Sequence, residues 1–177
     1  MIIIEKNLEQ LASQYSICDK VLLDDYSIKL QLGSSYYETL PFSGTVVYGC
    51  APTPSTLFAE LKTVSQNLTL DVGQRLICAT RHVYRMPVDY FGLVQTKGTL
   101  ARLFVIATCN DGQVEPGFEG FITLELVNLS PWKVEIPIGS DIAQMYLIKC
   151  SSPAANKYRG RYATGVKAGP TIPIFSL

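Results

Sequence analysis

The feature that most constrains the fold is a succession of short segments rich in Val, Ile, Thr, Tyr and Leu, separated by Gly, Pro, Asp and Asn. Segments of this length and composition are typical of β-strands, and the residues between them favour turns. We expect strands over residues 27–33, 44–49, 68–73, 75–86, 120–129, 133–139 and 143–150. Many short strands joined by turns predict an all-β sandwich or barrel.

Two segments depart from the strand pattern. Residues 5–16 place Leu8, Leu11 and Ala12 on one helical face, which predicts a short N-terminal helix. Residues 54–67 fit either a helix or an excursion of the chain over the surface, and the pattern leaves both open.

The C-terminal residues 151–177 are polar and contain three glycines and three prolines. This composition predicts an extended arm that a single copy of the chain would not easily bury. Arms of this kind usually cover a ligand or a neighbouring subunit. With 177 residues, we expect one domain over residues 1–177 that ends in this arm.

Composition and charge exclude several classes of protein. Apolar residues make up 47% of the chain and charged residues 17%, with 15 basic and 15 acidic side chains in no block. This balance argues against a nucleic-acid-binding tail or a disordered segment. The three isoleucines that precede Glu5 are too few for a signal peptide, and no run approaches a membrane span. We therefore expect a cytoplasmic protein with neither a membrane nor a nucleic acid as partner.

The cysteines and the histidine argue against a zinc site. Zinc needs three or four imidazole, thiolate or carboxylate ligands at close spacing, and His82 is the only histidine. The motifs of zinc-dependent nucleobase deaminases are missing, and nothing near His82 supports a catalytic triad. The five cysteines are scattered without a Cys-x-x-Cys pair, which favours reduced, buried thiols. They are Cys18, Cys50, Cys78, Cys109 and Cys150.

One acidic residue interrupts a strand that otherwise has the composition of a core. The alternation in residues 120–129 puts Ile122, Leu124 and Leu126 on one face, so that Glu125 faces the other way. That outer face is often solvent in an antiparallel sheet, and an ordinary solvated Glu is one interpretation. If it is buried, Glu125 needs a partner or a proton, and the nearest candidate partner is Arg102, after the turn-like Lys97–Thr99.

Six sequence pieces, taken together, resemble the dCTP deaminase and dUTPase superfamily, and dCTP deaminases most closely. The pieces are "LDDYSIKLQLG", "LDVGQRLICAT", "KGTLARLFV", "QVEPGFEGFITLELVN", "IGSDIAQMYLIK" and the tail "NKYRGR" followed by "AGPT". They occur in the family's order and extend from residue 22 to about residue 171. The resemblance implies a distorted, dUTPase-like β-barrel (a β-clip) and a homotrimer with active sites between subunits. It also implies an arm that closes over a nucleoside triphosphate, with magnesium on the phosphates and no zinc.

The resemblance assigns catalytic roles to two residues. The glutamate that matches Glu125 activates the water that attacks C4 of cytosine, and the arginine that matches Arg102 helps to hold the polar network of the site. Glu115 stands in the turn where the family usually has the Asp of dUTP-hydrolysing members, and its extra methylene weakens that assignment. The resemblance also implies that Asp111 contributes to substrate binding.

Further substrate-binding residues follow from the same resemblance. Lys97, Gly98 and Thr99 stand where the family has Arg-Ser-Ser, so Gly98 replaces a hydroxyl while Lys97 still offers a charge to phosphate. Backbone N–H groups near Gly98 could also hold an anion.

The remaining substrate-binding residues lie toward the C-terminus. Gln144 matches a glutamine near the triphosphate, and Lys157 and Tyr158 match residues that reach the phosphates and sugar. Arg161 occupies a place where glutamine is usual. Residues 162–168 then separate this motif from "GPT" by more than the family leads us to expect, so the arm should close differently.

The first functional hypothesis is hydrolytic deamination of dCTP, or of a related pyrimidine deoxynucleotide, to dUTP and ammonia by water that Glu125 activates without zinc. An alternative within the fold is a dUTP pyrophosphatase, or a bifunctional enzyme that also uses Glu115. A third is a regulatory relative that binds a nucleotide without catalysis, which the departures at Lys97, Gly98, Glu115 and Arg161 favour. Ammonia and pyrophosphate release distinguish the three.

Overall fold

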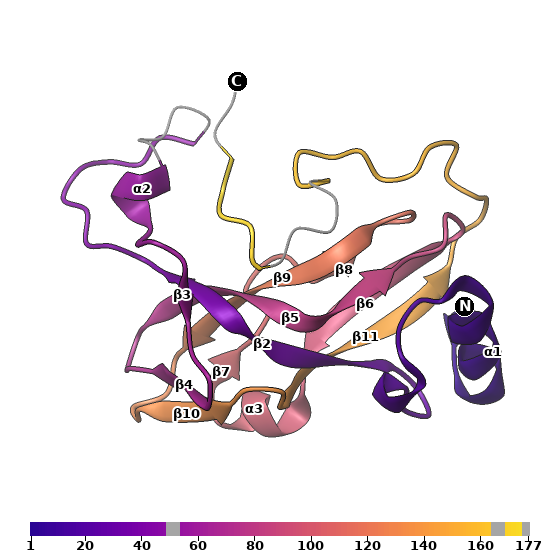
Figure 1. The fold of residues 1–177 in the computed structure, drawn as a ribbon, viewed down its shortest axis with the longest axis horizontal. Coiled ribbons are helices and arrows are strands. Elements are labelled where there is room, and N and C mark those ends of the chain that lie inside the picture. The colour runs from indigo at the N-terminus through magenta and orange to yellow at the C-terminus, as the bar shows by residue number, and fades with distance from the viewer. Residues whose placement is uncertain (49–53, 164–168, 175–177) are drawn as a thin grey trace.

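The computed structural model describes residues 1–48, 54–163 and 169–174 and is built mainly of antiparallel strands (Figure 1). The strands are β1 (Ile2–Ile3), β2 (Ile28–Glu38), β3 (Lys62–Thr63), β4 (Asn67–Leu70), β5 (Arg75–Arg85), β6 (Tyr90–Thr96), β7 (Val105–Ile106), β8 (Gln113–Val114), β9 (Glu119–Asn128), β10 (Val134–Pro137) and β11 (Asp141–Lys149). The helices are α1 (Glu5–Tyr15), the 3₁₀ turn η1 (Lys20–Leu22), α2 (Pro54–Leu57) and α3 (Gly98–Arg102).

Most of the strands join one curled sheet. Within the described residues its order is β7-β9-β5-β2-β11-β6-β8, with β1 added to β11 and β3 added to β2. A separate two-stranded sheet pairs β10 with β4 and lies beside α3, while α1 lies at the other end of the molecule (Figure 1). The prediction of a mainly β fold with a short N-terminal helix is confirmed.

The hydrophobic core follows the alternation of the strands. β9 shows this most clearly, because Ile122, Leu124 and Leu126 are buried, whereas Thr123 and Glu125 on the opposite face are only partly buried. Since successive side chains of a strand point to opposite faces, the prediction of which face packs into the core is confirmed.

The N-terminal helix is also confirmed. Leu8, Leu11 and Ala12 are buried on one face of α1. The ambiguous segment 54–67 is mostly an excursion, since α2 spans only its first four residues and the short strand β3 follows.

The strand predicted over residues 44–49 is wrong for its described part, residues 44–48, which contains no strand. Val46, Val47 and Tyr48 are exposed there. Their composition favours a strand, but that preference takes effect only where a neighbouring strand offers hydrogen bonds and a packing surface.

The sequence reading missed β6, which pairs with β11 over its whole length. Gly92, in the middle of the segment, weakens the strand pattern because glycine has a low strand preference. The packing of neighbouring side chains nevertheless requires a glycine there. A Cβ on Gly92 would lie 2.6 Å from Sδ of Met145 and 3.1 Å from Cβ of Val114. The turn expected at residues 97–99 is likewise wrong, because Lys97 caps the short helix α3, which begins at Gly98.

The thiols are less buried than predicted. Of the four cysteines in the described residues, all are free, but only Cys78 is buried and Cys109 is exposed. His82 is partly buried, and its Nε2 lies 3.1 Å from Oε1 of Gln31. No helix in the described part of the chain is long and apolar enough to cross a membrane.

Candidate active site

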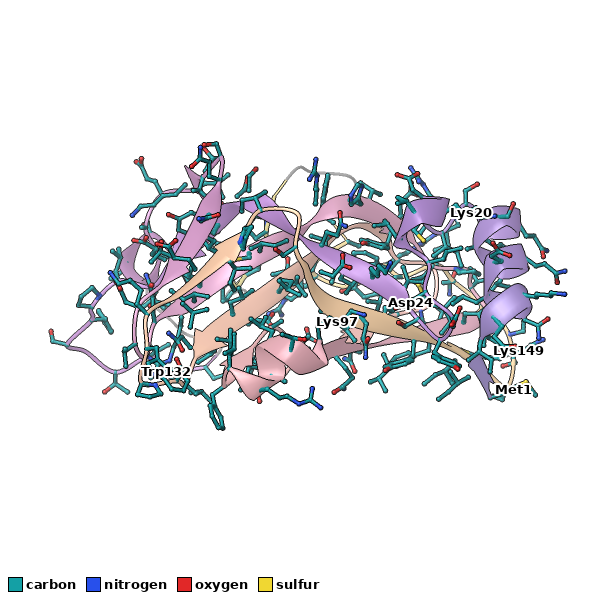
Figure 2. The ribbon with its side chains drawn as sticks, turned by 90° about the horizontal axis from the view of Figure 1, so that it is seen from below. Met1, Lys20, Asp24, Lys97, Trp132 and Lys149 are labelled. Atoms are coloured by element: carbon teal, nitrogen blue, oxygen red, sulfur yellow. The ribbon has the colours of Figure 1, made fainter. Side chains whose placement is uncertain are left out.

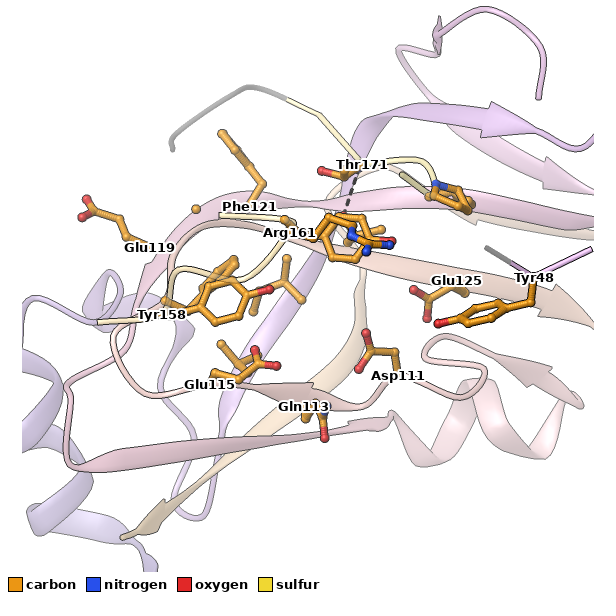
Figure 3. A pocket seen from close by; sticks show the side chains of 18 residues that line it. Tyr48, Asp111, Gln113, Glu115, Glu119, Phe121, Glu125, Tyr158, Arg161 and Thr171 are labelled. Atoms are coloured by element: carbon orange, nitrogen blue, oxygen red, sulfur yellow. Dashed lines mark hydrogen bonds between the residues drawn. The ribbon is translucent and has the colours of Figure 1, made fainter. Parts of the chain in front are cut away.

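A cavity of about 550 Å³ lies on the outer face of β9, between the β8 region and the C-terminal arm (Figure 3). One wall of the cavity is the face of β9 that turns away from the core. The partly buried side chains of that strand, such as Thr123 and Glu125, therefore line it. The polar residues that line it include Tyr48, Asp111, Gln113, Glu115, Glu119, Thr123, Glu125, Tyr158, Arg161, Tyr162 and Thr171.

Glu125 projects into this cavity from the middle of β9, where its Cα is paired with that of Ile77 on β5. Its Oε2 atom is buried and has no hydrogen-bond partner among the described residues. Burial, and secondarily the negative charge of Asp111, raises the pKa of Glu125 to about 7. The interpretation of Glu125 as an ordinary solvated side chain is therefore wrong: this carboxyl group exchanges protons near neutral pH.

Asp111 reaches the cavity from a tight loop that precedes β8. Its backbone N–H donates to the carbonyl oxygen of Thr108 at 2.9 Å, which closes a turn. The next residue, Gly112, lies so close to β6 that a Cβ there would be 2.8 Å from the carbonyl oxygen of Val94. The backbone thus fixes where the Asp111 side chain begins.

Glu115 lies on the other side of β8 in the predicted turn, which the structure confirms. The N–H of Phe118 donates to the carbonyl oxygen of Glu115 at 3.1 Å, and Gly117 has a φ of +80°, a conformation that favours glycine. Glu115 also lines the cavity, as does Glu119, so one chain brings four carboxyl groups, those of residues 111, 115, 119 and 125, to the same space.

The first part of the arm docks on this turn. The N–H of Tyr158 donates to the carbonyl oxygen of Pro116 at 3.2 Å, and the rings of Tyr158 and Phe118 are 6.1 Å apart. A Cβ on Gly117 would lie 2.7 Å from Cα of Lys157, so the arm touches the turn backbone to backbone. Burial, followed by the charge of Glu115, raises the pKa of Tyr158.

The described end of the arm returns to β9. The N–H of Thr171 donates to Oγ1 of Thr123 at 3.1 Å (Figure 3), and the guanidinium of Arg161 donates to the carbonyl oxygen of Ile174 at 3.0 Å. These contacts lie within one chain. The arm thus contacts its own chain at these points, but residues 151–163 are mostly exposed, so the expectation that a single copy would not easily bury the arm is confirmed for that part. Most of the long spacer at residues 162–168 lies outside the described residues.

The residues of α3 and its cap do not line this cavity. Nζ of Lys97 lies 3.5 Å from Oδ2 of Asp24, on the face shown in Figure 2. Gly98, Thr99 and Arg102 are exposed. The prediction that Arg102 partners Glu125 is thus not met within one chain. Glu125 projects from β9 into the cavity, whereas Arg102 is exposed on α3 and does not line it.

Gly98 leaves room for the guanidinium of Arg102, because a Cβ on Gly98 would lie 2.8 Å from Nη1 of Arg102. A serine at this position would displace that flexible group. The departure from the family pattern at residue 98 therefore goes together with a particular placement of the arginine.

Two other predicted residues also lie outside the cavity. Gln144 lies on β11, and its amide donates to the hydroxyl of Tyr146 at 2.6 Å. Lys157 is exposed in the arm beside Tyr158. Sequence reasoning in turn missed Phe118 and Tyr162, whose only signal is that they stand beside the predicted turn and within the predicted arm. It also missed Tyr48, for which the sequence gives no such signal.

Metal ligands do not gather in the described residues. No group of three or more His, Cys, Asp or Glu side chains there has an arrangement that could hold a metal ion.

Known proteins resemble this chain in sequence and in fold. A family model described as dCTP deaminase-like matches residues 4–150. A "dCTP deaminase, dUMP-forming" of Mycolicibacterium smegmatis is 35% identical over 106 residues, which cover 58% of this chain and 56% of that protein. The protein of the same name from Nocardia farcinica is 36% identical over 106 residues, 58% of this chain and 53% of that one. This chain spans about half the length of the curated relatives it matches.

A solved structure has the same fold. The crystal structure of 2'-deoxycytidine 5'-triphosphate deaminase from Agrobacterium tumefaciens superposes with a TM-score of 0.63 at 18% identity. The superposition covers 82% of this chain and 47% of that one. It confirms the predicted architecture.

Proposed function

We propose, since this chain belongs to the dCTP deaminase-like family, that it catalyses the hydrolytic deamination of dCTP or of a related pyrimidine deoxynucleotide. The observation that supports this most strongly is the Glu125 carboxyl group, which projects into a cavity with a pKa of about 7 and with one oxygen that has no partner among the described residues. A general base is most effective when its pKa lies near the working pH.

The reaction needs one base that later returns its proton. Ionised Glu125 accepts a proton from water while the water oxygen forms a bond to C4 of the base and the electron pair of the C4=N3 double bond moves to N3. Protonated Glu125 then gives that proton to the amino nitrogen, the electron pair on N3 re-forms the C4=N3 double bond, the bond from C4 to the amino nitrogen breaks, and ammonia leaves. Transfer of the C4 hydroxyl proton to N3 completes the uracil ring. Oxygen replaces nitrogen on C4 with no change of oxidation state, so no redox cofactor is required. Because burial limits the access of bulk water to Glu125, its proton affinity remains matched to both steps.

Magnesium enters the proposal only through the triphosphate, whose charge it would neutralise. Magnesium prefers carboxylate, phosphate and water oxygens. Glu115 offers such an oxygen from the cavity wall, so the residues present fit a magnesium–nucleotide complex. The role of the chain is to orient this complex, and Tyr158 and Arg161 of the arm are placed to contact it.

A neighbouring subunit is part of the proposal. Lys97 and Arg102, which the family pattern places in the active site, do not line the cavity of their own chain. This placement supports a homotrimer in which α3 of one subunit completes the cavity of the next.

A second candidate is a bifunctional enzyme that also releases pyrophosphate and yields dUMP. Two observations favour it: Glu115 lines the same cavity as Glu125, and the relatives described above are named dUMP-forming. In this version a second water, oriented by Glu115, attacks the α-phosphorus of the nucleotide.

The test incubates the purified protein with magnesium and either dCTP or dUTP, and measures ammonia and pyrophosphate separately. We expect ammonia from dCTP, and loss of at least about a hundredfold in Glu125→Gln, the usual contribution of a general base. Glu135→Gln is the matched control, because Glu135 also lies on a strand but does not line the cavity. Pyrophosphate together with ammonia would support the bifunctional enzyme. If nucleotide binds and neither product forms, the chain is a regulatory relative.

A further inference from the structure

We propose that Asp111 is a positioning residue whose negative charge, directed into the same cavity as Glu125, keeps a proton on Glu125 near neutral pH. The inference deepens the proposed function and rests on it, because it concerns how Glu125 becomes suited to accepting and returning a proton.

The two side chains come from different elements and meet in one cavity. Glu125 projects from the middle of β9, and Asp111 projects from the loop before β8. Figure 3 shows both carboxyl groups directed into the same part of the cavity. Neither backbone is free to withdraw: β5 pairs with β9 at Glu125, and the N–H of Val94 holds the carbonyl oxygen of Gly112 at 2.7 Å.

Among the described residues, the lining of the cavity contains more acidic than basic side chains. The cation that lines the cavity in the described residues is Arg161, whose guanidinium donates to the arm carbonyl of Ile174. Arg102, the predicted cationic partner, lies on α3 outside the cavity. The other ionisable groups that line the cavity are Tyr48, Glu115, Glu119, Tyr158 and Tyr162, and none of them brings a positive charge.

Two like charges in a partly desolvated space repel each other, and one proton relieves the repulsion. Of the two, Glu125 is the more buried, since Asp111 lies on the exposed rim of the cavity. Desolvation costs the buried group more in its ionised form, so the repulsion acts on Glu125 by favouring its protonated form. The pKa of Glu125, raised to about 7 first by burial and then by Asp111, agrees with this geometry.

The consequence for the reaction is direct. A carboxylate with a raised proton affinity is a stronger base toward water and still holds the proton when the leaving amine needs it. Asp111 thus supplies part of the basicity of Glu125 without touching the reacting atoms.

The test titrates Glu125 itself, with protein labelled with carbon-13 at the glutamate carboxyl carbon and Glu125→Gln used to assign the signal. In Asp111→Asn we expect the midpoint of Glu125 to fall by about 0.5 to 1 pH unit, the size of one neighbouring charge at partial exposure. Asp111→Glu, which restores the charge, should return the midpoint toward that of the unmodified protein. Both substitutions are at an exposed residue, so folding should be retained.

Glu115→Gln is the matched control, since it removes another carboxylate of the same cavity and should move the midpoint less than Asp111→Asn. An unchanged midpoint in Asp111→Asn, or an equal fall in Glu115→Gln, would overturn the inference. The titration requires no turnover. A shifted midpoint in a protein that releases no ammonia would therefore support the effect of Asp111 on Glu125 while refuting the proposed function. If ammonia is released, the pH profile of its rate should move to lower pH in Asp111→Asn.

Discussion

At the scale of single residues, Glu125 links stability to pH. Its pKa is about 7 in the folded protein against an ordinary value of 4.5, so folding favours the protonated form. The stability that Glu125 contributes is fully present below pH 4.5 and is lost as the pH rises through 7. This rise in pKa corresponds to about 3 kcal/mol, which the partial solvent access of the carboxyl group reduces to about 1–2 kcal/mol.

We therefore predict that the difference in unfolding free energy between the unmodified protein and Glu125→Gln changes by about 1–2 kcal/mol between pH 5 and pH 8, in favour of the Gln variant at pH 8. Urea unfolding of both proteins at the two pH values measures it, and all other titrating groups cancel in the difference. A difference that is independent of pH would show that Glu125 is solvated like any surface carboxylate.

At the scale of elements, the turn after β8 positions the arm. Gly117 has a φ of +80°, and an added Cβ would lie 2.7 Å from the arm backbone at Lys157. Gly117→Ala should strain the turn at a cost of about 1–2 kcal/mol. It should also displace the arm from its contact with the turn. We predict a KM for the nucleotide that is about 3 to 10 times higher, with the arm more rapidly cleaved by protease.

Gly73→Ala separates the contact from the strain. Gly73 has a similar φ of +73°, but nothing lies within 4 Å of its added Cβ, so this variant should lose stability without a change in KM. If the two variants have the same KM, the arm does not depend on its contact with the turn.

The elements also show how far sequence can lead. The faces of β9 and of α1 were predictable because their alternation is local and uninterrupted. β6 was not predictable, because a glycine at position 92 weakens the strand pattern. That glycine is required by the nearby Met145 side chain on another strand, which the local sequence does not show. Residues 44–48 have strand composition without a strand to pair with. In the site, Glu125 was recognisable because a carboxylate is unusual in a strand of that composition. The docking of the arm on Pro116 and the placement of Arg102 away from the cavity were not predictable, because they depend on tertiary contacts that no local pattern contains.

At the scale of the whole molecule, the proposed trimer makes a prediction about mixed subunits. Arg102→Ala keeps Glu125, and Glu125→Gln keeps Arg102, so each variant alone should be inactive. If each site takes Glu125 from one subunit and Arg102 from the next, subunits unfolded and refolded together in equal amounts should regain about a quarter of the unmodified activity.

Light scattering before and after mixing verifies that the assembly is a trimer. A mixture as inactive as its components would show that Glu125 of one subunit and Arg102 of another do not complete a site together, which would contradict the proposed shared site.

The central claim is that Glu125, with its raised pKa, is the base that activates water for attack on the nucleotide base. It is tested most directly by the rate of ammonia release from dCTP, measured from pH 5.5 to 8.5 in the unmodified protein and in Glu125→Gln. We predict a rate that rises with pH to a plateau with a midpoint near 7, and a Gln variant at background throughout. A rate that is already constant at pH 5.5, or a Gln variant that retains the pH-dependent activity, would contradict the account.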